Sequence, residues 1–563
     1  MKIINFFKKA IRYVRTHTFS QVIKRILGKR IPSDPTSEYL TWIDNNEPKS
    51  EELDRIKKFV PKYKYKFIFI LKSDANNEVI NSIQQQTYSN FQIIQYSKNS
   101  DLKDILYNTI GDYFVLVQNE CILSKFMLYE VLRKIDLNTC DVIYSDSDKI
   151  VKVNNKDGTS IEKRIEPVFK PDFAIDTLRS KNYIGNCIVI RKESLIKNKI
   201  NVDSKLNNII FDIMFKSYEN NLRIAHIPKV LYHDNVVNCN KNNYDEEIKI
   251  INSHLQRSNI KASLEEGKYK GQYHIVYDIA DLSDKISIII PNMDHVDDLK
   301  KCIESIKRST YSNYEIIIVE NNSKMNETFE YYNELKNDVR IKIEQFDIDY
   351  FNYSKIVNFG VQKSTGKYII LLNNDIEIIS NNWIEEMLMY ANRDDVGIVG
   401  AKLLFSDNSI QHAGVIIGIR GLAGHLYREV SNINIVEYPD IDLVQDLSAV
   451  TAACLMVKRS IFDSVRGFDY SFAVNFNDVD FCLKVREKGY LVVYNPNVQA
   501  YHYESKSRGL DTESEEKRKR FELEYNMFVN RWEREIKKGD PFYNKNYRLD
   551  DDVPKINYNK IIY

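Results

Sequence analysis

Short apolar runs alternate with amphipathic stretches between about residue 60 and residue 510. The clearest run is Tyr368–Leu372, five apolar residues that predict a strand buried on both faces. It ends abruptly in Asn373, Asn374 and Asp375. Further runs at 285–290 and 314–319, with helical periodicity between them, predict a mainly parallel sheet that carries helices on both faces.

The same plan occurs twice along the chain. Ser82–Phe91 parallels Ser305–Tyr314 in sequence, and Gly111–Val117 parallels Gly366–Leu372. Because the similarity follows element after element, it predicts two related α/β domains in tandem. The predicted regions are a basic amphipathic helical region at 1–58, a first domain at 60–275, a second domain at 283–510, and a C-terminal helix and tail at 511–563.

The N-terminal 30 residues are strongly basic and contain no acidic residue. Their apolar residues recur at helical spacing, which is typical of a helix lying on a membrane surface. A helix packed on the body of the protein with its lysines in solvent would have the same pattern, so both interpretations stay open. No apolar run in the sequence is long enough to span a bilayer.

The composition narrows the class of protein. A chain of 563 residues should contain more than one core, and 43% hydrophobic and 28% charged residues are ordinary for a globular protein. A net charge of +1 gives no reason to expect a nucleic-acid partner. The seven cysteines are scattered, which favours neither a disulfide framework nor a zinc site and fits a reducing compartment.

The end of the strand at Leu372 is the first candidate site. Ligands of open α/β sheets bind beyond the carboxyl ends of the strands. A single carboxylate there, Asp375, suits one hard cation that leaves its other positions to water and phosphate oxygens. Asp478 and Asp480, at the start of a predicted helix, and His502, after a predicted strand, are further candidates. Each also has a structural interpretation as a strand terminator, a helix-capping group or a hydrogen-bonded histidine.

Residues 283–510 resemble a family-2 glycosyltransferase with the GT-A fold. The resemblance rests on eight segments in family order: Ile288–Pro291, Val319–Ser323, Asn373–Asp375, Gln411–Gly414, Thr451–Leu455, Gly467–Asp469, Asn477–Phe481 and His502. The chain is similar in particular to long two-domain bacterial enzymes of surface-polysaccharide assembly, described as rhamnosyltransferase-like. That similarity extends to Tyr39–Ile43 and Asp540–Asn544, and so covers most of the chain.

The resemblance implies roles for the candidate residues. Asp375 takes the last position of the family's DXD motif, which holds Mn²⁺ or Mg²⁺ on the nucleotide diphosphate, and His502 would be a further metal ligand. Asp478 would be the catalytic base of an inverting displacement. Donor contacts are expected from Pro291, Glu320, Asn322, Asn358, Asn373 and Asn374, and acceptor contacts are candidates at His412 and Asp480. Because Asn373 and Asn374 replace acids, we expect weak metal binding without the nucleotide.

The first domain resembles the second less closely. Glu120, Asp212 and His233 align with Asp375, Asp478 and His502, and form a vestigial or second candidate site. We expect a diverged GT-A-like domain that binds saccharide or supports the second domain.

The sequence therefore predicts an inverting, metal-dependent glycosyltransferase. Its donor would be a UDP- or dTDP-linked sugar, and its acceptor a growing bacterial cell-surface glycan that is lipid-linked. The expected location is the cytoplasm, with peripheral contact at the inner face of the cell membrane. Two alternatives remain, namely a bifunctional glycan polymerase with both domains active and a noncatalytic glycan-binding or scaffold protein.

Overall fold

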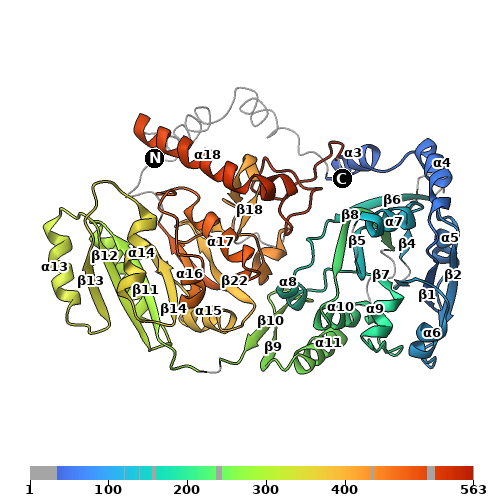
Figure 1. Ribbon diagram of the computed structural model, residues 1–563, viewed down its shortest axis with the longest axis horizontal. Coiled ribbons are helices and arrows are strands. Elements are labelled where there is room, and N and C mark those ends of the chain that lie inside the picture. The colour runs from blue at the N-terminus through green and yellow to red at the C-terminus, as the bar shows by residue number, and fades with distance from the viewer. Residues whose placement is uncertain are drawn as a thin grey trace.

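The computed structural model describes residues 35–118, 121–137, 140–154, 160–235, 244–279, 281–432, 437–503 and 514–561. These residues form two α/β units side by side, each built on its own sheet (Figure 1). The predicted basic helix at 1–30 and the candidate residue Glu120 lie outside the described residues. Within the described ranges, no helix combines the length and apolar composition needed to cross a membrane.

The first domain is an eight-stranded sheet in the order β2-β1-β3-β7-β5-β8-β4, with β6 paired to β5. Its strands are β1 (Phe67–Lys72), β2 (Phe91–Tyr96), β3 (Tyr113–Val117), β4 (Ile122–Leu123), β5 (Val142–Asn154), β6 (Ser160–Val168), β7 (Cys187–Arg191) and β8 (Ile224–Asn235). Its helices are α5 (Asn77–Gln84), α6 (Leu102–Asn108), α7 (Met127–Leu137), α8 (Ile175–Ser180), α9 (Lys192–Lys197), α10 (Ile209–Glu219) and α11 (Tyr244–Arg257). Helices α3 (Pro35–Asn46) and α4 (Ser50–Phe59) precede it, and the hairpin β9 (Ala262–Glu266) and β10 (Tyr273–Tyr277) follows it.

The second domain is a ten-stranded sheet in the order β13-β12-β11-β14-β21-β16-β22-β15, with β17 on β16 and β20 on β22. Its strands are β11 (Ile286–Asn292), β12 (Tyr314–Glu320), β13 (Ile341–Gln345), β14 (Tyr368–Leu372), β15 (Ile376–Ile378), β16 (Val396–Leu404), β17 (Ile410–His412), β20 (Gln445–Asp446), β21 (Cys454–Lys458) and β22 (Leu491–His502). A separate hairpin joins β18 (Val415–Ile417) and β19 (Ala423–His425). The helices are α12 (Val296–Lys307), α13 (Asn326–Leu335), α14 (Tyr353–Lys363), α15 (Trp383–Ala391), α16 (Arg459–Ser464), α17 (Asn477–Glu487) and α18 (Glu515–Lys538).

The two sheets have the same strand order and the same directions of pairing. Strand β1 corresponds to β11, β3 to β14, β7 to β21, β5 to β16, β8 to β22 and β4 to β15. The register agrees at the functional edge, where Ile122 pairs with His233 and Ile376 pairs with His502. The predicted tandem α/β architecture is therefore confirmed, and the second sheet adds β13 at its outer edge.

Strand β14 is buried throughout, as its composition predicts. All five of its residues are 0% exposed, because β11 and β21 flank it and helices cover both faces of the sheet. Burial of each such aliphatic side chain stabilises the fold by roughly 1.5–3 kcal/mol. The polar residues that follow β14 are thus held at the end of a rigid strand.

The C-terminal segment joins the domains. Helix α18 crosses the second domain (Figure 1), and its Glu524 accepts backbone N–H bonds from Ala473, Val474 and Asn475. The tail then reaches the first domain, where the Pro541 carbonyl accepts a hydrogen bond from the Asp172 N–H at 2.7 Å. Helix α3 lies beside this tail (Figure 1), and its Asn45 amide donates a hydrogen bond to the Tyr558 carbonyl.

Candidate active site

Asp375 and His502 meet at the carboxyl edge of the second sheet. Asp375 immediately precedes β15, and the pairing of β15 with β22 brings His502 beside it. His502 Nε2 lies 3.2 Å from Asp375 Oδ1, and both side chains are largely buried. The structure therefore brings together the two side chains that the sequence predicts as metal ligands.

The pair fits a divalent cation completed by other ligands. Adjacent ligands on an octahedral Mg²⁺ or Mn²⁺ lie about 3.0 Å apart when the metal–ligand bonds are near 2.1 Å, close to the observed separation. Carboxylate and imidazole are both suitable ligands for manganese. Among the described residues, no group of three or more His, Cys, Asp or Glu side chains could hold a metal. Diphosphate oxygens and water would have to complete the coordination.

His502 is held by two amides. Gln411, from β17, places its Nε2 atom 2.7 Å from His502 Nδ1, and Asn373 places its Nδ2 atom 3.4 Å from His502 Nε2. Gln411 is only 3% exposed. Partners of this kind orient an imidazole and influence its affinity for a metal.

Tyr353 lies near both the predicted metal ligands and the predicted base. Its hydroxyl is 3.4 Å from Asn373 Oδ1 and 3.3 Å from the Ala452 carbonyl. The Ala452 N–H in turn donates to Asp478 Oδ2 at 3.3 Å. Burial, together with the nearby charges of Asp478 and Asp375, raises the pKa of Tyr353, so its hydroxyl stays protonated. Tyr353 therefore lies close enough to both Asp375 and Asp478 for their charges to affect its hydroxyl.

Asp478 is the second residue of helix α17. Its Oδ1 accepts the Val479 N–H at 2.9 Å, and the positive end of the helix favours its negative charge. The side chain is partly exposed, in contrast to its buried neighbours in the helix. A carboxylate with this placement can accept a proton from a bound hydroxyl.

A chain of hydrogen bonds links Asn374 to Glu320. Asn374 donates to Asn292 at 2.6 Å, Asn292 donates to the Tyr332 hydroxyl at 2.8 Å, and that hydroxyl donates to Glu320 at 2.6 Å. Glu320 also accepts the Ser323 N–H and hydroxyl, so both of its oxygens are engaged. Within the described residues, Oε1 accepts only the Ser323 N–H, so it retains one acceptor position for a base or ribose hydroxyl.

The other predicted donor residues have different surroundings. Asn322 is exposed in left-handed backbone geometry (φ 60°), and its amide donates to the Ile348 carbonyl at 2.7 Å. Asn358 is buried and binds both the N–H and the carbonyl of Phe468, which fixes the loop after α16. Pro291 lies in β11 opposite Val319, one residue before Asn292.

The two acceptor candidates are both fully buried. Asp480 accepts bonds from Arg531 at 2.9 Å and Trp532 at 3.0 Å, which anchors α18 on α17 and supports a structural role. His412 Nδ1 lies 2.8 Å from His425 Nδ1. Burial and the neighbouring His425 and His502 hold the pKa of His412 well below its ordinary value, so its ring is neutral.

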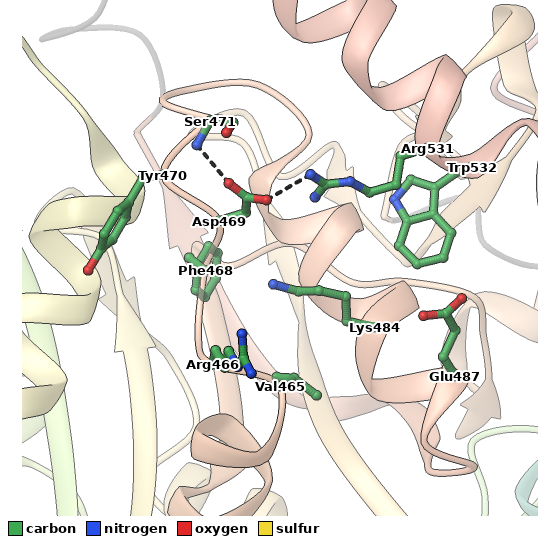
Figure 2. A pocket seen from close by; sticks show the side chains of 10 residues that line it. All are labelled: Val465, Arg466, Phe468, Asp469, Tyr470, Ser471, Lys484, Glu487, Arg531 and Trp532. Atoms are coloured by element: carbon green, nitrogen blue, oxygen red, sulfur yellow. Dashed lines mark hydrogen bonds and ion pairs between the residues drawn. The ribbon is translucent and has the colours of Figure 1, made fainter.

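A separate pocket of about 700 Å³ lies between α17 and α18 (Figure 2). It is lined by Val465, Arg466, Phe468, Asp469, Tyr470, Ser471, Lys484, Glu487, Arg531 and Trp532. Arg531 is paired with Asp469 at 2.8 Å, and Lys484 donates to the Gly467 carbonyl at 2.7 Å. None of the predicted metal or base residues lines it.

Comparison with known proteins agrees with this geometry. Residues 287–465 match the model of glycosyl transferase family 2. The second domain is a family-2 glycosyltransferase domain. The expected family is thereby confirmed.

The chain is also similar to larger proteins. It is 35% identical over 460 residues to the uncharacterized protein y4gI of Sinorhizobium fredii, an alignment that covers 78% of this chain and 49% of the relative. It is 30% identical over 454 residues to the O-antigen biosynthesis protein RfbC of Myxococcus xanthus, covering 78% of this chain and 34% of that protein. The chain therefore spans half or less of the length of these relatives.

Two further similarities are a shorter sequence match and a solved structure. A stretch of 65 residues, 12% of this chain, is 35% identical to 21% of an N-acetylglucosaminyl-diphospho-decaprenol L-rhamnosyltransferase of Mycobacterium tuberculosis. A solved structure of GalNAc-T7 with UDP, GalNAc and Mn²⁺ matches 48% of this chain and 53% of its own, with 15% identity and a TM-score of 0.38.

In the first domain, other parts of the chain cover the corresponding carboxyl edge of the sheet. His233 Nδ1 lies 2.5 Å from Asp148 Oδ1, and Asp148 also binds the Tyr39 hydroxyl of α3. Arg164 bridges Asp148 at 2.5 Å and Glu47 at 2.6 Å. The predicted residue His233 is thus part of a buried ion-pair network.

The C-terminal tail covers the adjacent carboxylate. Asp146 is 0% exposed and accepts bonds from Asn544 at 2.9 Å, Asn546 at 3.1 Å and His226 at 2.8 Å. Asn546 also accepts a bond from the Trp42 indole at 3.1 Å, so α3 and the tail close this edge together.

The structure changes one of the correspondences expected for the first domain. Cys121 directly precedes β4 as Asp375 directly precedes β15, but the segment between β3 and β4 is one residue longer than the segment between β14 and β15, and Glu120 in it lies outside the described residues. Asp212 is the fourth residue of α10 and pairs with Lys216 at 2.5 Å, as Asp480 in α17 faces Lys484 at 3.4 Å. Asp212 therefore corresponds to Asp480, and Ile210 corresponds to Asp478.

Two residues at the family-2 site were not selected from sequence. Gln411 belongs to Gln411–Gly414, one of the segments that carry the family resemblance. Its position directly before the candidate His412 is the sequence feature that could have indicated it. Tyr353 follows Asn352, whose side chain caps α14. Its hydroxyl comes near Asn373 only through the sheet, so local sequence gave no signal.

Proposed function

We propose that the family-2 domain transfers a sugar, with inversion, from a nucleotide-diphosphate donor to a growing bacterial cell-surface glycan. The observation that carries this proposal is the 3.2 Å separation of Asp375 and His502 at the carboxyl edge of the sheet. Hydrogen bonds through Tyr353 and Ala452 connect the neighbouring Asn373 to Asp478. The name of the RfbC relative supports a surface glycan, and that of the mycobacterial relative supports a lipid-linked acceptor.

The chain's own groups would act as follows. Asp375 and His502 would hold Mn²⁺ or Mg²⁺, which when bound would neutralise charge that develops on the departing diphosphate. Asp478 would accept the proton of the acceptor hydroxyl as that oxygen attacks the anomeric carbon. Asn373 and Asn374 would position diphosphate oxygens without adding negative charge. Attack from the face opposite the diphosphate inverts the anomeric centre.

The test is nucleotide release from purified protein with Mn²⁺ and a panel of UDP-, dTDP- and GDP-sugars. Hydrolysis of one donor that requires metal, and that disappears in Asp375→Ala, supports the proposal and identifies the donor. Equilibrium binding of the same donors covers an enzyme that needs its acceptor before it reacts. Failure of every donor to bind with metal would contradict the proposal and favour the scaffold alternative.

We further propose that only the family-2 domain is catalytic. The first domain has Ile210 at the position of Asp478, and its carboxylates Asp146 and Asp148 are bound by the C-terminal tail and by α3. A bifunctional polymerase would instead retain one transfer in Asp375→Ala. Detection of two chemically distinct transfers, one of them insensitive to Asp375→Ala, would restore that alternative.

We also propose that residues 1–30 hold the enzyme near anionic lipid through their nine basic residues. Flotation with vesicles that contain anionic lipid compares the full chain with a variant that lacks residues 1–30. We expect the full chain to float and the shortened variant to stay in solution. Equal soluble fractions of the full chain and the shortened variant would contradict this proposal.

A further inference from the structure

The imidazole of His502 faces more donors than it can accept. A neutral imidazole has one N–H and one acceptor nitrogen. Gln411 Nε2 lies 2.7 Å from His502 Nδ1, and Asn373 Nδ2 lies 3.4 Å from His502 Nε2. Both amides cannot donate to a neutral ring, so the hydrogen bonding at His502 has two alternative arrangements.

Gln411 is the amide that can resolve this conflict. Its own Oε1 is buried and has no hydrogen-bond partner among the described residues. A glutamine amide can turn by 180° about its last bond and exchange oxygen and nitrogen with little change of shape. After that turn, Oε1 faces His502 Nδ1 and can accept its proton. The rotation satisfies an oxygen that otherwise carries the cost of an unmade buried hydrogen bond.

We propose that Gln411 selects the tautomer of His502 and thereby links metal binding to the orientation of its own amide. With the amide nitrogen toward Nδ1, the ring carries its proton on Nε2, which lies 3.2 Å from Asp375 Oδ1. With the amide oxygen toward Nδ1, the Nε2 lone pair faces the Asp375 carboxylate. Two electron-rich atoms at that distance repel unless a cation binds both, so the cation stabilises the second arrangement. This inference rests on the metal site of the proposed function.

The first domain shows the fixed form of the same arrangement. His233, the counterpart of His502, places Nδ1 against the Asp148 carboxylate and Nε2 against the Ser124 hydroxyl at 3.1 Å. A carboxylate can only accept a proton from the ring when it is ionised, whereas an amide can donate or accept. Gln411 therefore gives the family-2 domain a reversible partner where the first domain has a permanent one.

The experiment measures tautomer and metal affinity without turnover. Nitrogen NMR of ¹⁵N-histidine-labelled full-length protein distinguishes the two His502 tautomers, and titration with MnCl₂ followed by EPR gives the affinity for Mn²⁺. Two variants separate the effects. Gln411→Glu supplies only acceptor oxygens at the same length, and Gln411→Met removes hydrogen bonding at similar volume.

We expect Mg²⁺ to move the His502 proton from Nε2 to Nδ1 in the natural protein. Gln411→Glu should show the Nδ1–H form without metal and retain Mn²⁺ affinity, whereas Gln411→Met should lose about 10- to 100-fold. Recovery in Gln411→Glu excludes a general packing defect. Mn²⁺ affinity that depends on Asp375 but not on Gln411 overturns this inference alone. Affinity that is unchanged in Asp375→Ala overturns the metal site of the proposed function and this inference with it.

Discussion

At the carboxyl edge of its sheet, the family-2 domain keeps Asp375 and His502 3.2 Å apart and leaves Asp478 partly exposed. The first domain has the same strand order and the same pairing at this edge, but α3 and the C-terminal tail cover it. Its carboxylates, Asp146 and Asp148, are both 0% exposed. The two domains thus share the order of strands in the sheet but differ in what covers its carboxyl edge.

The difference teaches what the scaffold alone does not determine. A shared fold does not confer shared function, because chemistry depends on the side chains at one edge and on their cover. In the first domain that cover is supplied by Tyr39, Asn544 and Asn546, which are distant in sequence from the sheet. The first domain therefore binds α3 and the C-terminal tail at this edge, whereas Asp478 of the second domain stays partly exposed.

The largest expected effect is on turnover by the family-2 domain. Asp478→Asn removes the proposed base but preserves its shape, and should lower kcat by roughly 10²–10⁴-fold. Thermal unfolding should change little, because Asp478 is partly exposed. Sugar transfer measured at saturating donor tests this expectation.

The matched control is Asp212→Asn in the first domain. Asp212 pairs with Lys216 in a structural position, so this variant should lose stability but not kcat. A comparable loss of kcat in both variants would contradict the division of roles between the domains.

The next largest effect concerns the cover of the first domain. Arg164→Met leaves the fully buried Asp148 without its guanidinium partner, which should reduce the free energy of unfolding by on the order of 3 kcal/mol. Turnover per folded molecule should stay unchanged. Denaturant titration and transfer assays on the same preparation measure both. A large loss of turnover in fully folded protein would show that the first domain contributes to catalysis.

Because of the same network, the free energy of unfolding should depend on pH in the acidic range. Burial opposes ionisation of Asp148, but His233, Arg164 and Tyr39 outweigh it and hold its pKa below the ordinary value of 3.8. A carboxyl whose pKa is lower in the folded state stabilises the fold fully above its unfolded value and loses that contribution as pH falls through the folded value. Compared with Asp148→Asn, the natural protein should lose its stability advantage below about pH 4. Urea denaturation at a series of pH values tests this, and a constant difference between the two proteins would refute it.

Much of this organisation could be predicted from sequence. The apolar run Tyr368–Leu372 and its repeat at 113–117 identify the two central strands, because strands buried on both faces leave a strong local pattern. The candidate metal ligand Asp375 could also be anticipated, since it lies three residues beyond the end of such a strand. His502 depended on the family resemblance, because only strand pairing brings it near.

The remaining features depend on long-range contacts. Asp212 corresponds to Asp480 because each is the fourth residue of its helix and each precedes a lysine by four residues. The sequence alone does not show where these helices begin, and it therefore suggests the correspondence with Asp478. The closure of the first domain joins Trp42 to Asn546, two residues separated by most of the chain. No local pattern reports such a contact, so only the folded arrangement reveals it.

The smallest expected effect distinguishes the two domains at the helix that follows each edge. Tyr353 begins α14 after the cap Asn352, and its counterpart Leu102 begins α6 after the cap Asp101. The Tyr353 hydroxyl makes only long contacts, 3.4 Å to Asn373 and 3.3 Å to Ala452. Tyr353→Phe should therefore cost about 1 kcal/mol or less in transition-state stabilisation, less than tenfold in kcat/KM.

Tyr353→Leu provides the sharper comparison, because it places the first domain's residue in the family-2 site. It removes the buried aromatic ring, which lies near the charges of both Asp375 and Asp478, as well as the hydroxyl, so its effect on kcat/KM should exceed that of Tyr353→Phe. If the two variants were equal, the ring would have no positioning role. If Tyr353→Phe alone lost several hundredfold, the hydroxyl would contact the reacting groups directly, and Tyr353 would join Asp478 as a catalytic residue.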